Sequence, residues 1–294
     1  MRILLTGGTG FIGSAVARDL LGAGHEVLAL ARSKSSADNV AAIGCHAVRG
    51  ELADAADWLP APDRVDAVIH TAATFGPDMA DVEAAFLGAL AGWAEGWSGT
   101  RGTALPLVYT GGCWLYGAVG DRTAVEGAPF DPLPAFAYMV DGRRRLIADP
   151  RLSTRIVHPA MVWDDGAGVI GGFCEDAGKG DPPVVIGGLD TRWPLVHRRD
   201  LARVYRLAFE RGDGGMDYHG VSESGVRVGD IARAVALRFG TPAPVVRPVG
   251  DAVAEMGAWA AGYALDQTME APRTRAALGW APAEPGVIEA IGRG

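Results

Sequence analysis

The sequence predicts an α/β fold in which a doubly wound parallel sheet is followed by a smaller C-terminal lobe. Short apolar runs alternate with amphipathic stretches through the first half of the chain, which is the pattern of parallel strands covered by helices on both faces. Beyond residue 159 the alternation loosens into glycine- and proline-rich stretches at 164–172 and 178–190. The 294 residues, 49% of them hydrophobic, suffice for one large domain and an additional lobe.

The expected strands are short apolar runs, and they cover residues 3–6, 26–31, 46–49, 67–71, 105–110 and 154–158. The expected helices are amphipathic stretches, and they cover residues 11–23, 35–43, 53–58, 80–97 and 143–148. Further helices are expected at about residues 200–210, 228–239 and 251–263. The segment 82–97 is rich in apolar residues.

Composition excludes several classes of protein. The formal net charge of -8 argues against nucleic acid or an anionic membrane as the main partner. No apolar run approaches a membrane span, and the first apolar run is too short for a signal peptide, so a cytoplasmic protein with a small-molecule substrate is expected. Three widely spaced cysteines indicate neither a disulfide framework nor a zinc site, and no metal is expected.

A glycine-rich segment follows the first expected strand directly and opens the first expected helix. Its glycines match the pattern Gly-x-Gly-x-x-Gly, in which an early glycine makes the tight turn. The middle glycine lets a pyrophosphate approach the backbone, and the last lets helix and strand pack closely. The helix N-terminus offers N–H groups and a positive dipole end. The candidates for binding a dinucleotide are Gly7, Gly8, Thr9, Gly10, Phe11, Ile12 and Gly13; the alternative is a glycine-rich turn without a ligand.

The chain is expected to fold into two parts, of which the first contains this motif. Residues 1–162 should form a dinucleotide-binding Rossmann domain, and the family resemblance described below implies that residues 196–222 return to it. Residues 163–195 and 223–294 should form the smaller substrate lobe. We expect the lobe at the carboxyl edge of the sheet, because open parallel sheets bind their ligands there.

The residues after the second expected strand indicate which dinucleotide is preferred. An NAD site usually has Asp or Glu about 20 residues past the glycines, to bind the ribose 2′-hydroxyl. Here the strand is followed by Arg32, Ser33 and Lys34. Two cations and a hydroxyl suit a 2′-phosphate, which a guanidinium binds bidentately. We therefore expect NADP(H) in preference to NAD(H); the alternative is that Arg32 and Lys34 are solvated charges at the start of a helix.

Several further stretches follow the glycine motif TGGTGFIG, namely VRGELAD, AVIHTAA, VYTGGCWLYG, RIVHPAMVW, WPLVHRRDLARVY and ALGWAP. In order and spacing they resemble the short-chain dehydrogenase/reductase superfamily, in its extended (atypical), NAD-dependent epimerase/dehydratase-like branch. The resemblance spans nearly the whole chain. It implies that Glu51 and Leu52 meet the adenine, that a loop at Pro159 passes the nicotinamide, and that the cofactor is lined by His70, Thr71, Ala72 and Ala73.

The chain departs from this family at its catalytic positions. The resemblance implies a catalytic Ser or Thr at Gly112 and a Tyr-x-x-x-Lys pair at Tyr138 and Gly142. In the family's mechanism the tyrosine is the acid or base, the lysine lowers its pKa, and the serine steadies the substrate oxygen. Tyr138 alone is retained, and Arg143 could supply a neighbouring cation. The alternative is that Tyr138 is an aromatic packing residue.

The stretch VYTGGCWLYG is expected to form a pocket wall beside the nicotinamide. Thr110 carries its only hydroxyl outside the tyrosines and is a candidate catalytic residue, which could instead point at the cofactor. Cys113 is adjacent to the missing serine, with a small packing residue as the alternative to a nucleophile. Large aromatic residues in the turn after this strand and beside the glycine-rich loops of the lobe could line an apolar pocket or pack in a core; with Gly112 and Cys113, the pocket candidates are Trp114, Tyr116, Trp163 and Trp193.

Three functions are compatible with these observations. The first is an NAD(P)-dependent oxidoreductase or epimerase/dehydratase-like enzyme for a small carbonyl, hydroxyl or sugar-like substrate, with a degenerate Ser-Tyr-Lys set. The second is a catalytically silent NADP(H)-binding sensor or regulator. The third is a non-redox isomerase or lyase on the same fold. By analogy with extended members of the family, residues 82–97 are a candidate interface for a homodimer.

Overall fold

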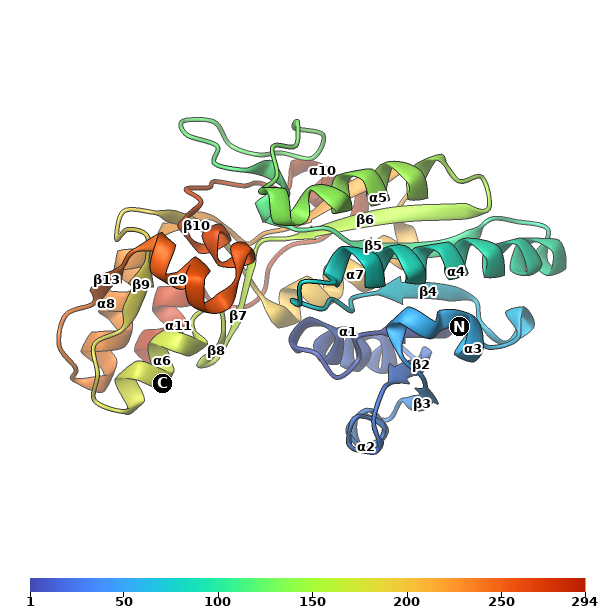
Figure 1. Ribbon diagram of the computed structural model, residues 1–294, viewed down its shortest axis with the longest axis horizontal. Coiled ribbons are helices and arrows are strands. Elements are labelled where there is room, and N and C mark those ends of the chain that lie inside the picture. The colour runs from blue at the N-terminus through green and yellow to red at the C-terminus, as the bar shows by residue number, and fades with distance from the viewer. Residues whose placement is uncertain (294) are drawn as a thin grey trace. The chain divides into compact units, whose positions relative to one another are not determined.

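A computed structural model describes residues 1–293 of the chain (Figure 1). Its largest sheet has seven strands in the order β11-β6-β5-β4-β1-β2-β3. β1 pairs in parallel with both β2 and β4, and β4, β5 and β6 continue in parallel on one side while β3 continues on the other. The strand order therefore reverses at β1, which is the topological switch point where doubly wound sheets bind ligands. The predicted fold class is confirmed.

The strands of this sheet are β1 (Arg2–Thr6), β2 (Glu26–Ala31), β3 (His46–Arg49), β4 (Ala67–His70), β5 (Leu105–Thr110), β6 (Leu152–Pro159) and β11 (Met216–Gly220). A second sheet has the order β12-β10-β7-β8, with β7 (Met161–Asp164), β8 (Ala167–Gly168), β10 (Arg192–His197) and β12 (Glu223–Arg227). A third consists of β9 (Val184–Ile186) and β13 (Val245–Arg247).

The α-helices are α1 (Phe11–Gly22), α2 (Lys34–Ile43), α3 (Ala55–Trp58), α4 (Met79–Arg101), α5 (Ala137–Ala148), α6 (Gly171–Gly178), α7 (Arg198–Arg211), α8 (Val228–Phe239), α9 (Val249–Met256), α10 (Pro272–Leu278) and α11 (Val287–Arg293). Short 3₁₀ helices are η1 (Leu52–Asp54), η2 (Pro62–Arg64), η3 (Cys113–Tyr116), η4 (Pro134–Phe136) and η5 (Ala258–Ala264).

The chain forms two compact units. The first comprises residues 1–111, 138–157 and 202–218, and the second comprises residues 112–137, 158–201 and 219–294. The first unit holds the glycine motif and most of the large sheet. The expected boundaries differ from this division mainly at residues 112–137 and 158–162, which belong to the second unit.

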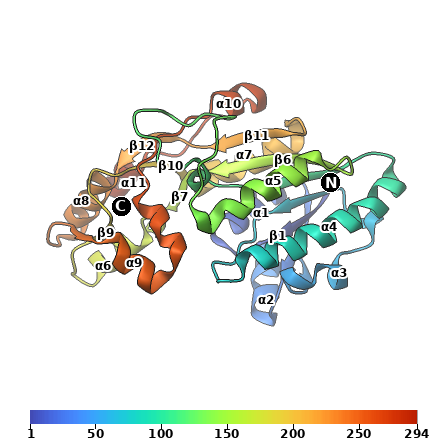
Figure 2. The ribbon, with the colours of Figure 1, turned by 45° about the horizontal axis from the view of Figure 1, so that its top comes forward.

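In the first unit, buried residues of α4 pack against the large sheet and form part of its hydrophobic core. α4 and α5 run side by side along β4, β5 and β6 (Figures 1 and 2). On α4 the buried residues recur every three or four positions, as a helix requires to face a sheet. These are Phe86, Leu90, Ala94 and Trp97, and they join a cluster that includes Leu107 and Ile156.

Most of the expected elements are present. The strands at 26–31, 46–49 and 105–110 and the helix at 228–239 have the expected bounds. α5 begins at Ala137, six residues before the expected start, because the glycine at 142 is accommodated inside the helix. The helix expected at 251–263 is interrupted at Gly257, whose φ of 101° is incompatible with a continuous right-handed helix.

Within residues 1–293, none of the helices combines the length and the apolar character that crossing a membrane requires.

Candidate functional site

The glycine motif forms a tight cradle between β1 and α1. Gly7 has φ 77°, and a Cβ there would lie 2.7 Å from the backbone nitrogen of Ala72. A Cβ on Gly13 would lie 2.1 Å from the carbonyl oxygen of Gly7. Larger residues are therefore excluded at both positions, because the Gly7 turn packs on the loop after β4 and on the first turn of α1 at once.

The start of α1 is suited to bind an anion. Gly10 is the N-cap, and no side chain within the described residues caps the helix there. Its N–H donates to the carbonyl of Gly7 at 2.8 Å, which closes the turn. Thr9 and Gly10 are exposed, and Phe11 and Ile12 are partly exposed. A phosphate can therefore approach the positive end of the helix, where N–H groups of the first turn lack partners inside the helix.

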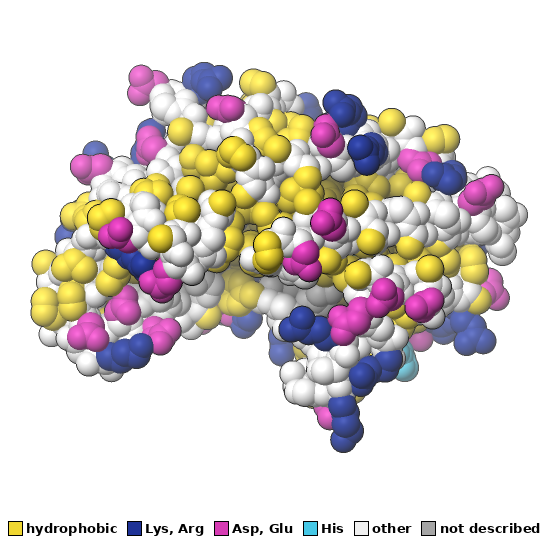
Figure 3. Space-filling view, in the orientation of Figure 1, with side chains coloured by type: hydrophobic (Ala, Val, Ile, Leu, Met, Phe, Trp, Pro, Cys, Tyr) yellow, Lys and Arg dark blue, Asp and Glu magenta, His cyan; other side chains and the backbone are white. Residues whose placement is uncertain are grey.

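Basic residues gather at the carboxyl ends of β2 and β3. Arg32 and Lys34 follow β2 and are exposed. Arg49, at the end of β3, pairs in register with Ala31 and donates to the carbonyl of Arg32 at 3.4 Å. Sequence reasoning missed Arg49, which only the strand pairing brings beside Arg32. Figure 3 shows dark-blue side chains over α2 and the neighbouring strand ends.

Ser33 has a structural role at the same corner. It is the N-cap of α2, and its hydroxyl accepts from the N–H of Ser36 at 3.1 Å in a reciprocal capping box. Its contact with a 2′-phosphate stays a prediction.

The predicted adenine residues follow β3. Glu51 is exposed, and its carbonyl accepts from the indole N–H of Trp58 at 2.6 Å. A Cβ on Gly50 would lie 2.3 Å from that indole, so Trp58 fixes the backbone from Gly50 to Glu51. Leu52 is partly buried at the start of η1.

The loop after β4 joins the glycine cradle. The hydroxyl of Thr71 donates to the carbonyl of Thr6 at 2.7 Å, and the N–H of Ala72 donates to the Thr6 hydroxyl at 3.4 Å. Ala73 follows and is exposed. The structure therefore brings Thr71 and Ala72 against Gly7; that they line a cofactor stays a prediction.

A buried polar chain runs from β1 to α4. The hydroxyl of Thr6 and Nδ1 of His70 are 2.7 Å apart, and Nε2 of His70 lies 3.1 Å from Oε2 of Glu83. The neutral histidine with a proton on Nε2 satisfies both contacts, accepting from Thr6 and donating to Glu83. Burial opposes the charge of Glu83, but the neighbouring imidazole of His70 and hydrogen bonds from His70 and the Tyr109 phenol outweigh it and hold the pKa of Glu83 below its ordinary value.

Tyr138 lies in the first turn of α5 and is partly buried. Burial and the Glu83 carboxylate raise the pKa of its phenol to about 12. At Gly142 a Cβ would meet Leu87 and the hydroxyl of Tyr109 at 3.6 and 3.8 Å. The cation that would lower the pKa of Tyr138 is thus absent from the position where the resemblance implies it.

Arg143 and Thr110 are both held by other groups. Nε of Arg143 donates to Oδ1 of Asp217 at 2.7 Å, and its Nη2 contacts Oδ2 of the same carboxylate. The hydroxyl of Thr110 donates to the carbonyl of His70 at 2.6 Å and lies 2.8 Å from the hydroxyl of Tyr205. Their catalytic roles stay predictions, and these contacts do not favour them.

In the second unit, the turn after β5 is firmly held. The side-chain amide of Gln267 donates to the carbonyls of Cys113 and Gly117 at 2.8 and 2.7 Å. A Cβ on Gly112 would meet nothing within 4 Å, so this position faces open space. Burial raises the pKa of the Cys113 thiol to about 12, which opposes the thiolate that a nucleophile needs.

The predicted pocket aromatics lie mostly inside the second unit. Trp163 and Trp193 are 1% and 3% exposed, and Trp193 donates to the carbonyl of Tyr263 at 2.9 Å. Trp114 is partly exposed and packs on Phe136 and Tyr263. Their indoles therefore contribute to the interior of the unit, and a pocket-lining role stays a prediction.

The end of β6 carries a buried aromatic cluster. Tyr116 is 4% exposed, and its hydroxyl donates to Nε2 of His219 at 2.7 Å. His158 accepts from the N–H of Gly112 at 3.3 Å and contacts the rings of Tyr116 and His219. Pro159 follows His158 directly and is buried in the same unit. These contacts hold the turn at Gly112 against β6.

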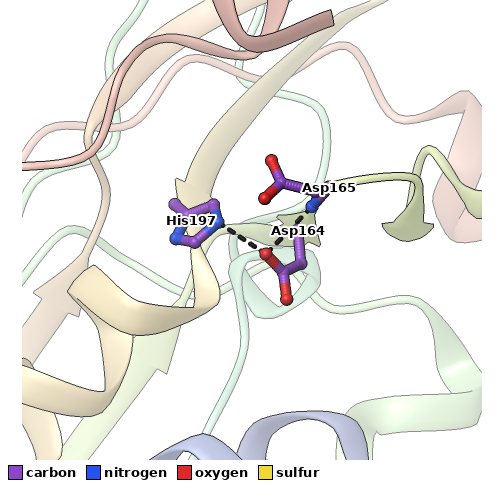
Figure 4. A group of neighbouring side chains, drawn as sticks. All are labelled: Asp164, Asp165 and His197. Carbon is purple, nitrogen blue, oxygen red and sulfur yellow. Dashed lines mark hydrogen bonds and ion pairs between the residues drawn. The ribbon is translucent and has the colours of Figure 1, made fainter. Parts of the chain in front are cut away.

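Asp164, Asp165 and His197 form another group of ionisable side chains (Figure 4). One oxygen of Asp164 accepts from His197 and from the N–H of Asp165, at 2.8 and 2.9 Å. Arg198 contacts the other oxygen. Because Asp164 is neutralised by an arginine and its oxygens are already bonded, this group is better explained as a junction of β7, β10 and α7 than as a metal site.

Comparison with known proteins agrees with this geometry. The family model described as "NAD dependent epimerase/dehydratase family" matches residues 3–140. The uncharacterized protein YLL056C of Saccharomyces cerevisiae is 30% identical over 99% of this chain and 98% of its own length. The chain belongs to the NAD-dependent epimerase/dehydratase family.

Solved structures of several dinucleotide-bound proteins have the same fold. A dTDP-glucose 4,6-dehydratase from Streptomyces venezuelae with NAD bound is 20% identical, with a TM-score of 0.80 over 100% of this chain and 95% of that chain. A human epimerase family protein, SDR39U1, with NADPH is 22% identical, with a TM-score of 0.75 over 100% of this chain and 98% of that chain. Membership of the family indicates an enzyme that uses a nicotinamide dinucleotide.

Proposed function

We propose that this epimerase/dehydratase-family chain is an NADP(H)-dependent reductase for a small carbonyl compound, working with a degenerate Ser-Tyr-Lys set. The observation that carries the cofactor preference is the basic corner formed by Arg32, Lys34 and Arg49. Three cations at the ends of β2 and β3 favour the doubly charged 2′-phosphate over a free ribose hydroxyl.

The glycine cradle fits a dinucleotide on steric grounds. The exclusion of a Cβ at Gly7 and Gly13 keeps backbone at the surface where a pyrophosphate would lie against α1. Glu51 and Leu52 would meet the adenine, and Thr71, Ala72 and Ala73 would flank the cofactor beside the cradle. When bound, the reduced nicotinamide supplies a hydride to the substrate.

The pKa of Tyr138 supports reduction of a carbonyl compound as the direction of the reaction. With a pKa of about 12 the phenol keeps its proton at neutral pH. It can therefore donate that proton to a carbonyl oxygen as negative charge develops there, but it is poorly suited to remove a proton from an alcohol. This asymmetry favours carbonyl reduction over alcohol oxidation. The substrate could be a simple ketone, an aldehyde or a sugar-like carbonyl.

Absorbance at 340 nm tests the reductase proposal. Purified protein with NADPH is mixed with a panel of aldehydes, ketones and keto sugars, and each rate is compared with that of Tyr138→Phe. We expect NADPH oxidation with at least one carbonyl compound and a loss of about 10²–10⁴-fold in kcat for Tyr138→Phe. A substrate turned over equally well by Tyr138→Phe would refute the role of Tyr138.

A catalytically silent NADP(H)-binding sensor is the second candidate. It is favoured by the coincidence of Gly112, Gly142 and a phenol whose pKa is raised rather than lowered. Tight NADPH binding without turnover of any carbonyl compound would select this function over the reductase.

A further inference from the structure

The second unit contains a cavity that neither the cofactor assignment nor the reductase proposal uses. Its volume is about 310 Å³, which lies in the range of about 300–1,000 Å³ typical of small-molecule sites. The described lining comes from residues 221–224, where β11 leads into β12, and from residues 269–275, which run into α10. All of these residues belong to the second unit.

The backbone beside the cavity is held on both sides. The N–H of Glu270 donates to the carbonyl of Ala124 at 2.9 Å, and the carbonyl of Glu270 accepts from Nδ1 of His219 at 2.8 Å. The carboxylate of Glu126 accepts from the N–H and the hydroxyl of Thr274, at 2.8 and 2.7 Å, and so fixes the start of α10. A site formed by a backbone held in this way requires little ordering when a ligand binds.

Two residues of the lining carry opposite charges that are not paired. Glu270 and Arg275 are both exposed, and neither makes an ion pair within residues 1–293. The guanidinium of Arg275 lies over the ring of Trp280, 5.3 Å from its centre. A guanidinium over a ring still has N–H groups at its edge that can donate. The lining therefore offers one cationic donor and one anionic acceptor to a ligand.

The rest of the lining combines hydroxyl groups with apolar surface. Ser224 is partly buried, and its hydroxyl makes no hydrogen bond to the described part of the chain. The hydroxyl of Ser222 donates to the carbonyl of Leu195 at 3.0 Å, which leaves its oxygen able to accept. Buried apolar residues also line the cavity, namely Val221, Met269 and Ala271. A few polar groups beside apolar surface are the usual composition of a small-molecule site.

The two charges distinguish among ligands. A simple anion would meet the carboxylate of Glu270 as well as the guanidinium of Arg275, and a simple cation would meet the same pair of charges with the signs reversed. A ligand with a carboxylate and an ammonium satisfies both residues. A guanidinium binds a carboxylate through two parallel hydrogen bonds, and an ammonium is a compact charge that one carboxylate can bind.

We propose that this cavity binds a free amino acid with an apolar side chain, its carboxylate on Arg275 and its ammonium on Glu270. The hydroxyl of Ser224 is available as a further contact to the ligand, and the side chain of the ligand would lie on Val221 and Met269. This binding site does not depend on the reductase proposal, because it shares no residue with the cofactor cradle or with the surroundings of Tyr138.

Calorimetric titration of the full-length protein with L-leucine tests the site, at constant ionic strength and without nucleotide. 4-Methylpentanoate is leucine without its ammonium, and 3-methylbutylammonium is leucine without its carboxylate. We expect saturable binding of leucine, and binding of each analogue that is weaker by about tenfold or more. The reason is that each analogue leaves one charged residue of the site without its partner.

Two substitutions assign the charges. Glu270→Gln should weaken leucine binding by about tenfold or more but should not weaken the binding of 4-methylpentanoate, which has no ammonium. Arg275→Gln should weaken leucine binding to a similar extent but not the binding of 3-methylbutylammonium. Both side chains are exposed, so both variants should fold. Glu175→Gln and Arg233→Gln are the controls, at exposed positions outside the lining, and should leave leucine binding unchanged.

Three results would overturn the proposal. Leucine could fail to bind, either analogue could bind as tightly as leucine, or Glu270→Gln or Arg275→Gln could bind leucine as tightly as the unchanged protein. The comparison of leucine with its analogues uses the unchanged protein, so it decides the question even if a variant does not fold.

Discussion

Tyr138 lies beside the anionic Glu83, and burial together with this carboxylate raises the pKa of the phenol to about 12. This is the reverse of what a lysine at position 142 would do. A proton-donating phenol remains possible, whereas a phenolate base does not form near neutral pH. The chemistry proposed for this chain follows from that relationship.

Gly142→Lys should lower the pKa of Tyr138 by about 1–3, because an ammonium near the phenol favours its anionic form. The helix has room, since the first contacts of a Cβ are ordinary ones at 3.6 and 3.8 Å. The measurement is an ultraviolet titration of phenolate, with Tyr138→Phe subtracted in each background. Gly142→Met is the uncharged control; an equal decrease in both variants would show that bulk rather than charge is responsible.

Gly13→Ala should destabilise the first unit by about 1–3 kcal/mol, because the added methyl group would overlap the carbonyl of Gly7. Gly22 lies on the same helix, and a Cβ there meets nothing within 4 Å. Gly22→Ala should therefore raise the free energy of unfolding by about 0.5–1 kcal/mol. Urea denaturation of both variants checks the pair, and similar effects at the two positions would contradict the packing described for the cradle.

Asp164→Asn should cost about 1.5–3 kcal/mol at pH 7, because His197 and Arg198 lose a charged partner. Burial opposes the charge of Asp164, but the Asp165 N–H, Arg198 and His197 hold its pKa below the ordinary value. Its stabilisation is thus present above the unfolded-state pKa of about 3.9 and is lost as the pH falls through the lower folded-state pKa.

The difference in the free energy of unfolding between Asp164→Asn and the unchanged protein should therefore decrease as the pH is lowered. Denaturation at a series of pH values measures it. Asp165→Asn is the control, because Asp165 is exposed and its nearest ion pair, with Arg199, spans 3.8 Å. A difference for Asp164→Asn that stayed constant down to pH 2 would contradict this assignment of the charge.

Arg49→Ala should weaken NADPH binding by about 1.5–3 kcal/mol, roughly 10- to 100-fold in Kd, and leave NADH binding nearly unchanged. Arg49 reaches the carbonyl of Arg32 and so lies at the same corner. Fluorescence titration with each nucleotide gives both constants. Arg18→Ala is the control, because Arg18 lies on α1 and contacts the carbonyl of Ser14. Equal losses for NADPH and NADH would place Arg49 outside the 2′-phosphate site.

The sequence predicted the parts of the structure that depend on local rules. The cradle from Gly7 to Gly13 and the strands around it could be predicted from the sequence. The spacing of the apolar residues, the glycines of the turn and the first residues of the helix all indicate the same strand–turn–helix unit there. Arg49 could not be found this way, since its place beside Arg32 depends on the parallel register of β2 and β3.

Contacts between residues far apart in the sequence account for the other features that could not be predicted. The ion pair of Arg143 with Asp217 joins residues 74 positions apart, so the cation expected beside Tyr138 is held elsewhere. The indoles of Trp163 and Trp193 are buried by strands that no local pattern marked. The burial of Tyr138 and of its neighbour Glu83, whose carboxylate adds to the effect of that burial on the pKa of the phenol, is likewise visible only in the folded structure.

The central claim is that this chain binds NADP(H) through its glycine cradle and basic corner. Calorimetric titration of the purified protein with NADPH and NADH, repeated with Arg32→Ala, tests it most directly. The account predicts that NADPH binds at least about tenfold more tightly than NADH and that Arg32→Ala removes most of this difference. Binding of neither nucleotide, or tighter binding of NADH, would contradict it.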